Sequence, residues 1–373
     1  MNEPRTLALC AGPGGFSEAA SILGVDLGEL GVDISRDACA TATAAGHARL
    51  NADIATLSPA DFPTVTGLIV TTPCPTFSKA GKRTGNGEDY QHMLDAITAL
   101  GTDMCGHVCD EGCIDFGCEH VTPHPDEHGV MQPENPAWRA VYEQVQDERT
   151  ALVVQTARFA LHLPSVEWVI AENVPALECA WEDLAAEMSA AGWESVNVVV
   201  LNAHDYGAGS RRERAFLYAR KFTPAPGQYG TRVPAPSSAQ VLGWPDGEKM
   251  RTRNNRRPTG GNLFSTDGPA WCLTGKARSC ERDSDRARIT PADAGALQGF
   301  PRDYPWQGSR SSQFQQIGDV VSPLVGAAIL GTVLGVEWVV PVRERARMLG
   351  LGPAPGCLAE APAGVPVQLV MEW

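Results

Sequence analysis

Cys74 stands between two prolines in TTPCPTFSKAG, directly after the apolar run GLIVTT. A thiolate is a strong nucleophile, and the two prolines fix the backbone φ angles on both sides of this one. The run before it has the β-branched composition of a buried parallel strand, and open α/β sheets bind ligands beyond the carboxyl ends of such strands. The pattern therefore predicts a nucleophile held rigidly beside a ligand. The alternative is a buried structural cysteine, the commonest environment of this residue type.

A second apolar run, VEWVIAEN, carries Glu172 at its end and predicts another strand of the same sheet. Glu172 and Cys74 would then face one crevice, where a carboxyl group can protonate or hold a ring nitrogen. Arg212 and Arg214 follow in GSRRERAF, two residues apart, the spacing at which side chains of a strand share one face. The alternative for these arginines is a solvated, charged strand end.

The elements that must position these residues begin with RTLALCAGPGGFSEAASILG, which predicts a strand, a glycine-rich turn and a helix. Glycine lets the backbone approach a ligand closely, and a helix N-terminus presents N–H groups to it. A second predicted strand ends in Asp33, placed where a carboxylate can accept hydrogen bonds from both ribose hydroxyls, and Asp53 follows a third strand. Together they predict a nucleoside cofactor. A turn selected only for packing is the alternative.

These elements, in this order, resemble the DNA cytosine carbon-5 methyltransferase family. The resemblance is carried by CAGPGGFS, TTPCPTFSKAG, AENV, YGAGSRRER, ITPADAGALQGFP and QQIGDVVSPLVGAAI, spread along nearly the whole chain. It implies the α/β Rossmann-like fold of S-adenosylmethionine-dependent methyltransferases, with a small target-recognition lobe. The implied reaction is methyl transfer to carbon-5 of a flipped-out cytosine in DNA, through a covalent cysteine adduct.

The resemblance also implies the role of each site residue. Cys74 would add to carbon-6 of cytosine, and Glu172 would hold ring N3 and the exocyclic amine. Arg214, with Arg212 nearby, would support the cytosine oxygen and the loop. The expected cofactor-binding residues are Ala11, Gly12, Gly14, Gly15, Phe16, Asp33, Ile34, Asp53, Ile54, Pro73, Asp319 and Val320.

Three residues depart from the family pattern. Pro75 stands where the family usually has Gln, Ser210 replaces the Gln of the arginine element, and Asp319 replaces an Asn. The nucleophile, the acid and both arginines are retained, so the departures affect base support and cofactor contacts more than the reaction. They leave room for an unusual analogue of the cofactor.

The charge balance constrains how DNA can bind. The chain has 30 Lys and Arg against 44 Asp and Glu, a net charge of -14, which argues against a broad basic surface. Basic residues are concentrated within segment 222–288, where the family has its recognition lobe, so we expect a monomer that binds double-stranded DNA locally. A solvated loop is the alternative. The expected DNA-binding residues are Ser78, Lys79, Arg251, Arg253, Arg256 and Arg257.

An insertion at about 101–124, MCGHVCDEGCIDFGCEHVTPH, is rich in cysteine and histidine. Four thiolates can hold a tetrahedral zinc ion, so the insertion predicts a structural zinc site. The predicted ligands are Cys105, Cys109, Cys113 and Cys118. Because their spacings resemble standard zinc ligands only loosely, a metal-free insertion is the alternative.

We expect a catalytic cofactor-binding domain at 1–221, a recognition lobe at 222–288, a closing segment at 289–340 and a peripheral tail at 341–373. The N-terminus lacks a secretory signal, and no apolar run reaches the length of about 20 residues that a membrane span needs. These features predict a cytoplasmic or nucleoid-associated enzyme of a bacterial or phage-infected cell, without membrane contact. The alternative functions are methylation of cytosine in transfer RNA and catalytically silent DNA binding.

Overall fold

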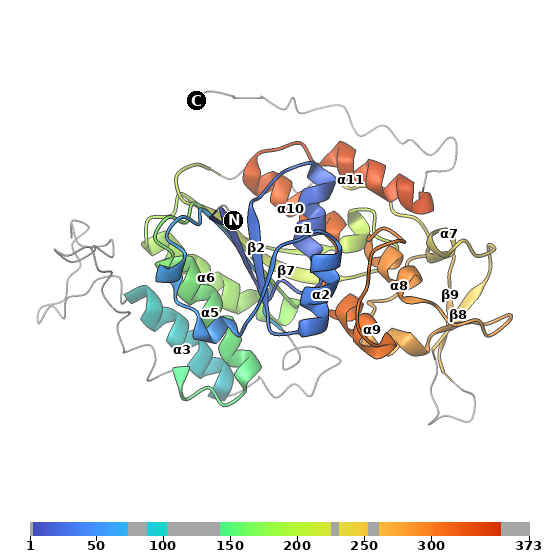
Figure 1. Ribbon diagram of the computed structural model, residues 1–373, viewed down its shortest axis with the longest axis horizontal. Helices are drawn as coiled ribbons and strands as arrows, with labels where there is room; N and C mark the ends of the chain where they lie inside the picture. Colours follow the sequence, from blue (N-terminus) through green and yellow to red (C-terminus); the bar gives the residue numbers. More distant parts are fainter. Residues whose placement is uncertain (1–2, 74–87, 103–141, 225–230, 253–260, 352–373) are drawn as a thin grey trace, which may run out of the picture.

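The computed structural model describes residues 3–73, 88–102, 142–224, 231–252 and 261–351. A seven-stranded sheet with the order β3-β2-β1-β4-β5-β7-β6 forms the centre of the protein (Figure 1). Strands β1 to β5 are parallel, and β7 runs antiparallel to both of its neighbours. The strands are β1 (Thr6–Leu9), β2 (Glu29–Asp33), β3 (Arg49–Asn51), β4 (Gly67–Val70), β5 (Trp168–Asn173), β6 (Ser195–Asn202) and β7 (Glu213–Arg220). The predicted Rossmann-like α/β fold is confirmed.

Strands β1 and β4 lie side by side at the middle of the sheet, and every residue of both is buried. This explains why their sequences are uninterrupted apolar runs, since helices cover both faces of a parallel sheet. After β3 the chain returns to the other side of β1, so the strand order reverses between β1 and β4. Such a reversal is where open α/β sheets form a crevice at their carboxyl ends.

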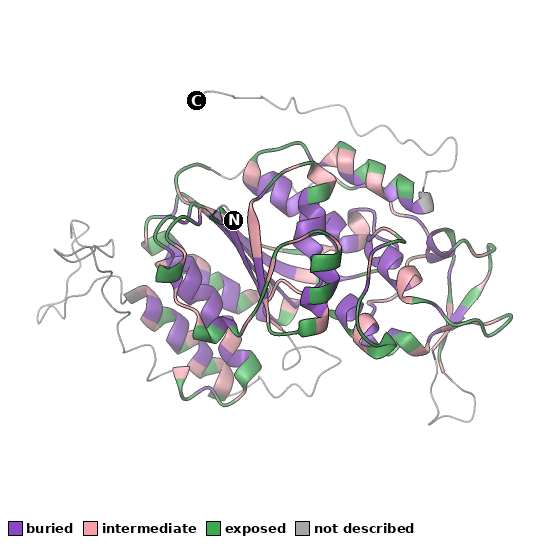
Figure 2. Cartoon of the chain, viewed as in Figure 1, coloured by how far each residue is buried: buried purple, intermediate pink, exposed green. Residues whose placement is uncertain are grey.

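Two helical layers bury the two faces of the sheet (Figures 1 and 2). Neighbouring residues of one strand face opposite layers, so Ile69 packs with one hydrophobic cluster and Leu68 with the other. On the first face lie α1 (Gly15–Leu23), α10 (Pro323–Leu334) and α11 (Val339–Ala346). On the second lie α3 (Glu88–Thr102), α5 (Glu148–His162) and α6 (Glu178–Ala190). Helix α2 (Arg36–Ala44) connects β2 to β3.

A smaller lobe follows β7 and lies on the right in Figure 1. Its centre is an antiparallel three-stranded sheet with the order β10-β8-β9. The lobe contains α7 (Ser238–Leu242), β8 (Lys249–Arg251), β9 (Leu263–Ser265), the 3-10 helix η6 (Gly275–Ser279) and β10 (Glu281–Arg282). The chain then returns through α8 (Pro291–Gln298) and α9 (Arg310–Asp319). Helix η6 packs against α9, so the lobe is joined to the catalytic domain beside the sheet.

The packed chain continues past residue 341, where we expected a peripheral tail to begin. Helix α11 spans this boundary, and its Val342 and Ala346 are buried. Arg345 donates to the Glu18 carboxylate on α1 at 2.7 Å. The expectation is therefore wrong for this part of the segment, because a short amphipathic helix completes the layer over α1 and α10. Residues 352–373 lie outside the described residues.

Within the described residues, the helical stretch Arg310–Leu334, formed by α9 and α10, is long and apolar enough to cross a membrane. However, 89% of its apolar window is buried inside the protein. An apolar helix enclosed in this way belongs to the core of a folded domain.

Val342→Asp should lower the free energy of unfolding by about 2 kcal/mol or more, because it would bury a carboxylate without a partner beneath α11. Val340→Asp is the matched control, since Val340 lies on the same helix but is 60% exposed. The control should change the free energy by less than about 0.5 kcal/mol. Denaturant unfolding measures both values, and equal effects would show that α11 is not part of the cooperative core.

Candidate active site

The carboxyl ends of β1, β2, β4 and β5 surround one cavity of about 1580 Å³. The cavity also reaches Arg212 and Arg214 at the start of β7 and Asp319 at the end of α9. The structure thus brings together most of the predicted catalytic and cofactor-binding residues. Those lining the cavity are Ala11, Gly12, Gly15, Phe16, Asp33, Ile34, Asp53, Ile54, Pro73, Glu172, Arg212, Arg214, Asp319 and Val320.

Gly14 was expected to contact the cofactor, but it does not line the cavity. It lies on the opposite side of the glycine loop, the turn between β1 and α1. A Cβ atom on Gly14 would lie 2.9 Å from the Tyr304 hydroxyl and 3.1 Å from the His47 ring, and its φ is +105°. The same hydroxyl donates a hydrogen bond to the Pro13 carbonyl at 2.5 Å. Glycine is needed here for close packing and a left-handed backbone, so Gly14 shapes the loop from the side away from the cavity.

The cavity wall at the glycine loop fits the adenosine part of S-adenosylmethionine. Gly12 lines the cavity, and a Cβ atom there would meet nothing within 4 Å, so the loop leaves an open cradle. The Asp33 carboxylate accepts from the amides of Gly12 at 2.8 Å and Ser35 at 2.7 Å. Each oxygen keeps a further acceptor site for a ribose hydroxyl. Ile34 is 71% exposed and lines the same cavity, presenting an apolar side chain to a purine.

Two further acids, at strand and helix ends, line the cofactor side of the cavity. Asp53 follows β3, as predicted, and accepts from the Ala55 amide at 3.0 Å, which fixes its side chain. Asp319 accepts from Gln315 at 2.6 Å, and burial raises the pKa of its carboxyl group. The family pattern has a neutral Asn at this position, so the Asp replaces an amide by a carboxyl group that can exchange a proton.

Glu172 is buried at the end of β5 and forms an ion pair with Arg214, whose Nε lies 2.9 Å from Oε1 of the carboxylate. Burial raises the pKa of Glu172, while the charges of Arg214 and Arg212 offset part of this effect. A buried carboxyl group with a raised pKa retains its proton more readily than an exposed one. It can therefore donate a proton to a ring nitrogen.

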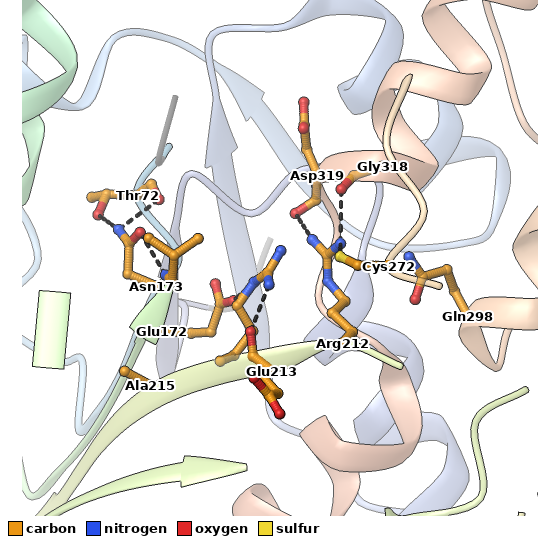
Figure 3. Close-up of polar contacts among 12 residues, drawn as sticks. Thr72, Glu172, Asn173, Arg212, Glu213, Ala215, Cys272, Gln298, Gly318 and Asp319 are labelled. Carbon is orange, nitrogen blue, oxygen red and sulfur yellow. Dashed lines mark hydrogen bonds and ion pairs between the residues drawn. The ribbon is translucent and has the colours of Figure 1, made fainter. Parts of the chain in front are cut away.

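Arg212 points away from Glu172 and bonds to the carboxyl end of α9. Its guanidinium donates to the carbonyl oxygens of Gly318 at 2.9 Å and Asp319 at 3.0 Å (Figure 3). The sequence placed both arginines on one strand face, but Arg212 precedes β7 and Arg214 lies within it. Arg214 is thus the arginine beside Glu172, and Arg212 is bonded to the opposite cavity wall.

Asn173 is a site residue to which the sequence had assigned no role. Its amide nitrogen donates to the Thr72 carbonyl and hydroxyl oxygens, both at 3.0 Å, and its oxygen accepts from the Val174 amide at 2.8 Å (Figure 3). These buried bonds join the ends of β4 and β5 just before Cys74. The signal was present, since a polar amide directly after Glu172 at the end of an apolar strand needs buried partners.

Arg251, expected to bind DNA, forms an ion pair within the lobe. Its guanidinium contacts Asp283 at 2.8 Å through Nε and at 2.6 Å through Nη2.

Other predicted residues lie outside the described residues, namely Cys74, Ser78, Lys79, Cys105, Cys109, Cys113, Cys118, Arg253, Arg256 and Arg257. Among the residues that the structure does describe, no group of three or more His, Cys, Asp or Glu side chains could hold a metal ion.

The family model for C-5 cytosine-specific DNA methylases matches residues 5–100, 142–236 and 245–334, which together make up most of the chain. The chain belongs to the C-5 cytosine-specific DNA methylase family. This methylase therefore transfers a methyl group from S-adenosylmethionine to cytosine in DNA. The matched ranges include the glycine loop, Glu172, both arginines and most of the closing segment, so the family match covers the main residues of the cavity.

The methylase is also similar to individual known proteins. It is 24% identical to the Type II methyltransferase M.AplI of Arthrospira platensis over 289 residues, covering 70% of this chain and 83% of that protein. A stretch of 93 residues, 24% of this chain and 25% of that relative, is 31% identical to the Type II methyltransferase M1.HphI of Haemophilus parahaemolyticus. The structure of the Entamoeba histolytica methyltransferase EhMeth matches with a TM-score of 0.58 at 11% identity, covering 90% of this chain and 99% of that one. This last likeness shows the fold.

Glu172→Gln should alter how stability depends on pH, because it removes the titrating group while keeping its shape. A raised pKa means that the folded chain binds this proton more tightly than the unfolded chain. Glu172 therefore favours folding below its ordinary pKa of 4.5, and this contribution is lost as the pH rises through the higher pKa of the folded state. The stability of the wild type relative to the variant should fall as the pH rises from about 4.5 towards neutrality.

Thermal melts of the two proteins over this pH range measure that difference. A constant offset between wild type and variant is expected, because the glutamine changes the pairing of Arg214 at every pH. Only the change of this stability difference with pH reports the titration of the Glu172 carboxyl group. A difference that does not change with pH would contradict a raised pKa for Glu172.

Proposed function

We propose that the methylase acts on a cytosine flipped out of double-stranded DNA, through a covalent adduct between Cys74 and carbon-6 of the base. The observation that carries the proposal is the buried Glu172–Arg214 ion pair on the cavity wall. The same wall includes Pro73, the residue before Cys74 in the chain. Glu172, the proposed proton donor, and Pro73, which precedes the thiol in the chain, therefore line the same cavity.

The chemistry explains why both groups are needed. Carbon-5 of cytosine is a poor nucleophile, and attack of the Cys74 thiolate at carbon-6 moves electron density onto it. As the sulfur–carbon bond forms, Glu172 gives its proton to ring N3, which would otherwise gain negative charge. S-adenosylmethionine supplies the methyl group as an electrophilic sulfonium when bound. Carbon-5 then loses its proton to a base, the sulfur–carbon bond breaks, and N3 returns its proton to Glu172.

Arg214 and Asn173 would position the reacting groups rather than exchange protons. Arg214 orients the Glu172 carboxylate by the 2.9 Å contact, and its charge keeps the carboxyl pKa from rising further. Asn173 fixes Thr72, so the chain leaves β4 in one direction towards Cys74. Precise placement of a nucleophile and an acid lowers the entropic part of the barrier.

The position of Glu172 supports base flipping as part of the proposal. Glu172 is 4% exposed, at the carboxyl end of a central strand, and a base stacked in a duplex cannot approach a group buried to this degree. Rotation of one nucleotide out of the helix would bring ring N3 to the carboxyl group. This supports a flipped cytosine as the reacting species, and we propose that the smaller lobe contacts the surrounding DNA.

Other parts of the proposal come from the sequence. We propose that the methylase acts as a cytoplasmic monomer and that its DNA contacts include the predicted residues Ser78, Lys79, Arg253, Arg256 and Arg257. The zinc site at Cys105, Cys109, Cys113 and Cys118 also stays a prediction. Metal analysis of the purified protein tests it, and a preparation without bound zinc that is fully active would contradict a required structural metal.

Cys74→Ser should reduce methylation to background and should abolish covalent trapping on a DNA duplex that contains 5-fluorocytosine. Fluorine at carbon-5 cannot leave as a proton does, so the wild-type adduct should persist on a denaturing gel. A serine hydroxyl is a much weaker nucleophile near neutral pH than a thiolate. Cys272→Ser is the matched control, because this thiol lines the same cavity, and it should still be trapped.

Two results would overturn the proposal. Trapping of the Cys74→Ser variant would remove Cys74 from the nucleophilic role. Methyl transfer to RNA but not to a DNA duplex by the wild type would contradict double-stranded DNA as the substrate. Cofactor binding, measured by calorimetry, should be the same in wild type and in both cysteine variants, which separates a chemical defect from misfolding.

A further inference from the structure

Among the described residues, three arginines of the small lobe form ion pairs with acids of the same lobe. Besides Arg251, which contacts Asp283, Arg286 contacts Glu281 at 2.6 Å and Arg282 pairs with Asp285. A guanidinium already bound to a carboxylate contributes little net attraction for a phosphate. In an acidic protein, the cations that do attract DNA should therefore be those without such partners.

Lys276 and Arg278 on helix η6 differ from these arginines. Both side chains are exposed, and both line the cavity that contains Glu172 and Arg214. Within the part of the chain that the structure describes, no acidic side chain forms an ion pair with either residue. Two cations without acidic partners thus stand on the wall of the catalytic cavity.

Helix η6 is fixed to the elements that form the site. The Thr274 hydroxyl caps it by accepting from the Lys276 amide at 3.3 Å, and Arg212 donates to the Leu273 carbonyl at 3.5 Å. A Cβ atom on Gly318 would lie 2.5 Å from the Gly275 nitrogen, so the backbones of η6 and α9 are in close contact. The backbone that carries Lys276 and Arg278 is therefore packed against the elements that form the active site.

We propose that Lys276 and Arg278 bind the DNA phosphates that flank the flipped cytosine. The inference rests on the proposed function, because only a flipped base requires its flanking phosphates at this position. A flipped nucleotide stays joined to its strand by two phosphates, so they reach the mouth of the cavity that receives the base. A lysine acts there as a point charge, and an arginine can donate two parallel hydrogen bonds to one phosphate.

The two cations help to explain how a chain with a net charge of -14 binds a polyanion. Charge close to the reacting nucleotide stabilises the bound, flipped state, whereas charge spread over the lobe would mainly increase binding to any DNA. Lys276 and Arg278 thus act as phosphate-binding residues for the proposed reaction. They are distinct from the predicted DNA contacts Arg253, Arg256 and Arg257.

The test compares two double variants with the same change of charge. In Lys276→Ala/Arg278→Ala, both proposed phosphate contacts are lost. The control is Arg282→Ala/Arg286→Ala, which also removes two cations from this lobe. Both of these arginines pair with acids, and neither lines the cavity. DNA affinity is measured for each protein at several salt concentrations, and S-adenosylmethionine affinity is measured by calorimetry.

The Lys276→Ala/Arg278→Ala variant should bind DNA more weakly, and its logarithmic salt slope should be shallower by about 1.8, since each phosphate contact contributes about 0.9. The control should keep the wild-type slope, and both variants should bind the cofactor normally. The conservative variant Lys276→Gln/Arg278→Gln should repeat the result, with circular dichroism showing a native fold.

An unchanged slope in the first variant, or an equal loss in the control, would overturn the inference, because the effect would then be absent or a matter of total charge. If either result is found and the wild type still methylates DNA, the proposed function stands and only the proposed phosphate contacts are wrong. If the wild type neither methylates nor traps cytosine in DNA, the proposed function fails and the inference fails with it.

Discussion

The hydrogen bonds of Arg212 to the Gly318 and Asp319 carbonyls connect the two walls of the site directly. They join the start of β7 to the end of α9 across a separation of 106 residues. One wall of the cavity belongs to the sheet and the other to α9 and η6, and these bonds tie the two walls together, along with the bond between Thr41 of α2 and Gln316 of α9. A buried guanidinium suits this task because its planar fork can donate to several carbonyl oxygens at once.

The same region shows a conflict between stability and chemistry. A carboxyl group at the buried position of Glu172 is unfavourable in its charged form, and the nearby arginines compensate only partly. An apolar residue there would suit the core better, but it could not carry out the proton exchange that we propose for Glu172. The cost is confined to one residue at the end of a well-packed strand, where the surrounding sheet can tolerate it.

The sequence predicted the strands and the acids at their ends correctly for a physical reason. Buried parallel strands appear as continuous apolar runs, and a polar residue directly after such a run must lie at the carboxyl edge of the sheet. Glu172 could therefore be placed at this edge without knowledge of the tertiary structure, and Asp33 and Asp53 follow strands of the same sheet whose sequences are more polar. Their convergence required only that the strands share one sheet.

The orientation of individual side chains could not be predicted in this way. Arg212 and Arg214 differ in their partners because α9 lies beside one and Glu172 beside the other, and neither neighbour is close in sequence. Gly14 faces the back of its loop because Tyr304 packs there, and α11 is held through Glu18. Each of these contacts joins residues far apart in the chain, which local patterns of hydrophobicity and turn residues do not encode.

The hydrogen bond from Tyr304 to the Pro13 carbonyl has a consequence for how the enzyme is made. It spans 291 residues, so the glycine loop, although among the first parts to leave the ribosome, lacks its support until almost the whole chain has been translated. At about 5–20 residues per second, this interval is roughly 15 to 60 seconds. During that time the nascent chain can have β1 to β5 in place but not a finished cofactor site. Premature termination anywhere before the closing segment should therefore leave a fragment that cannot methylate DNA.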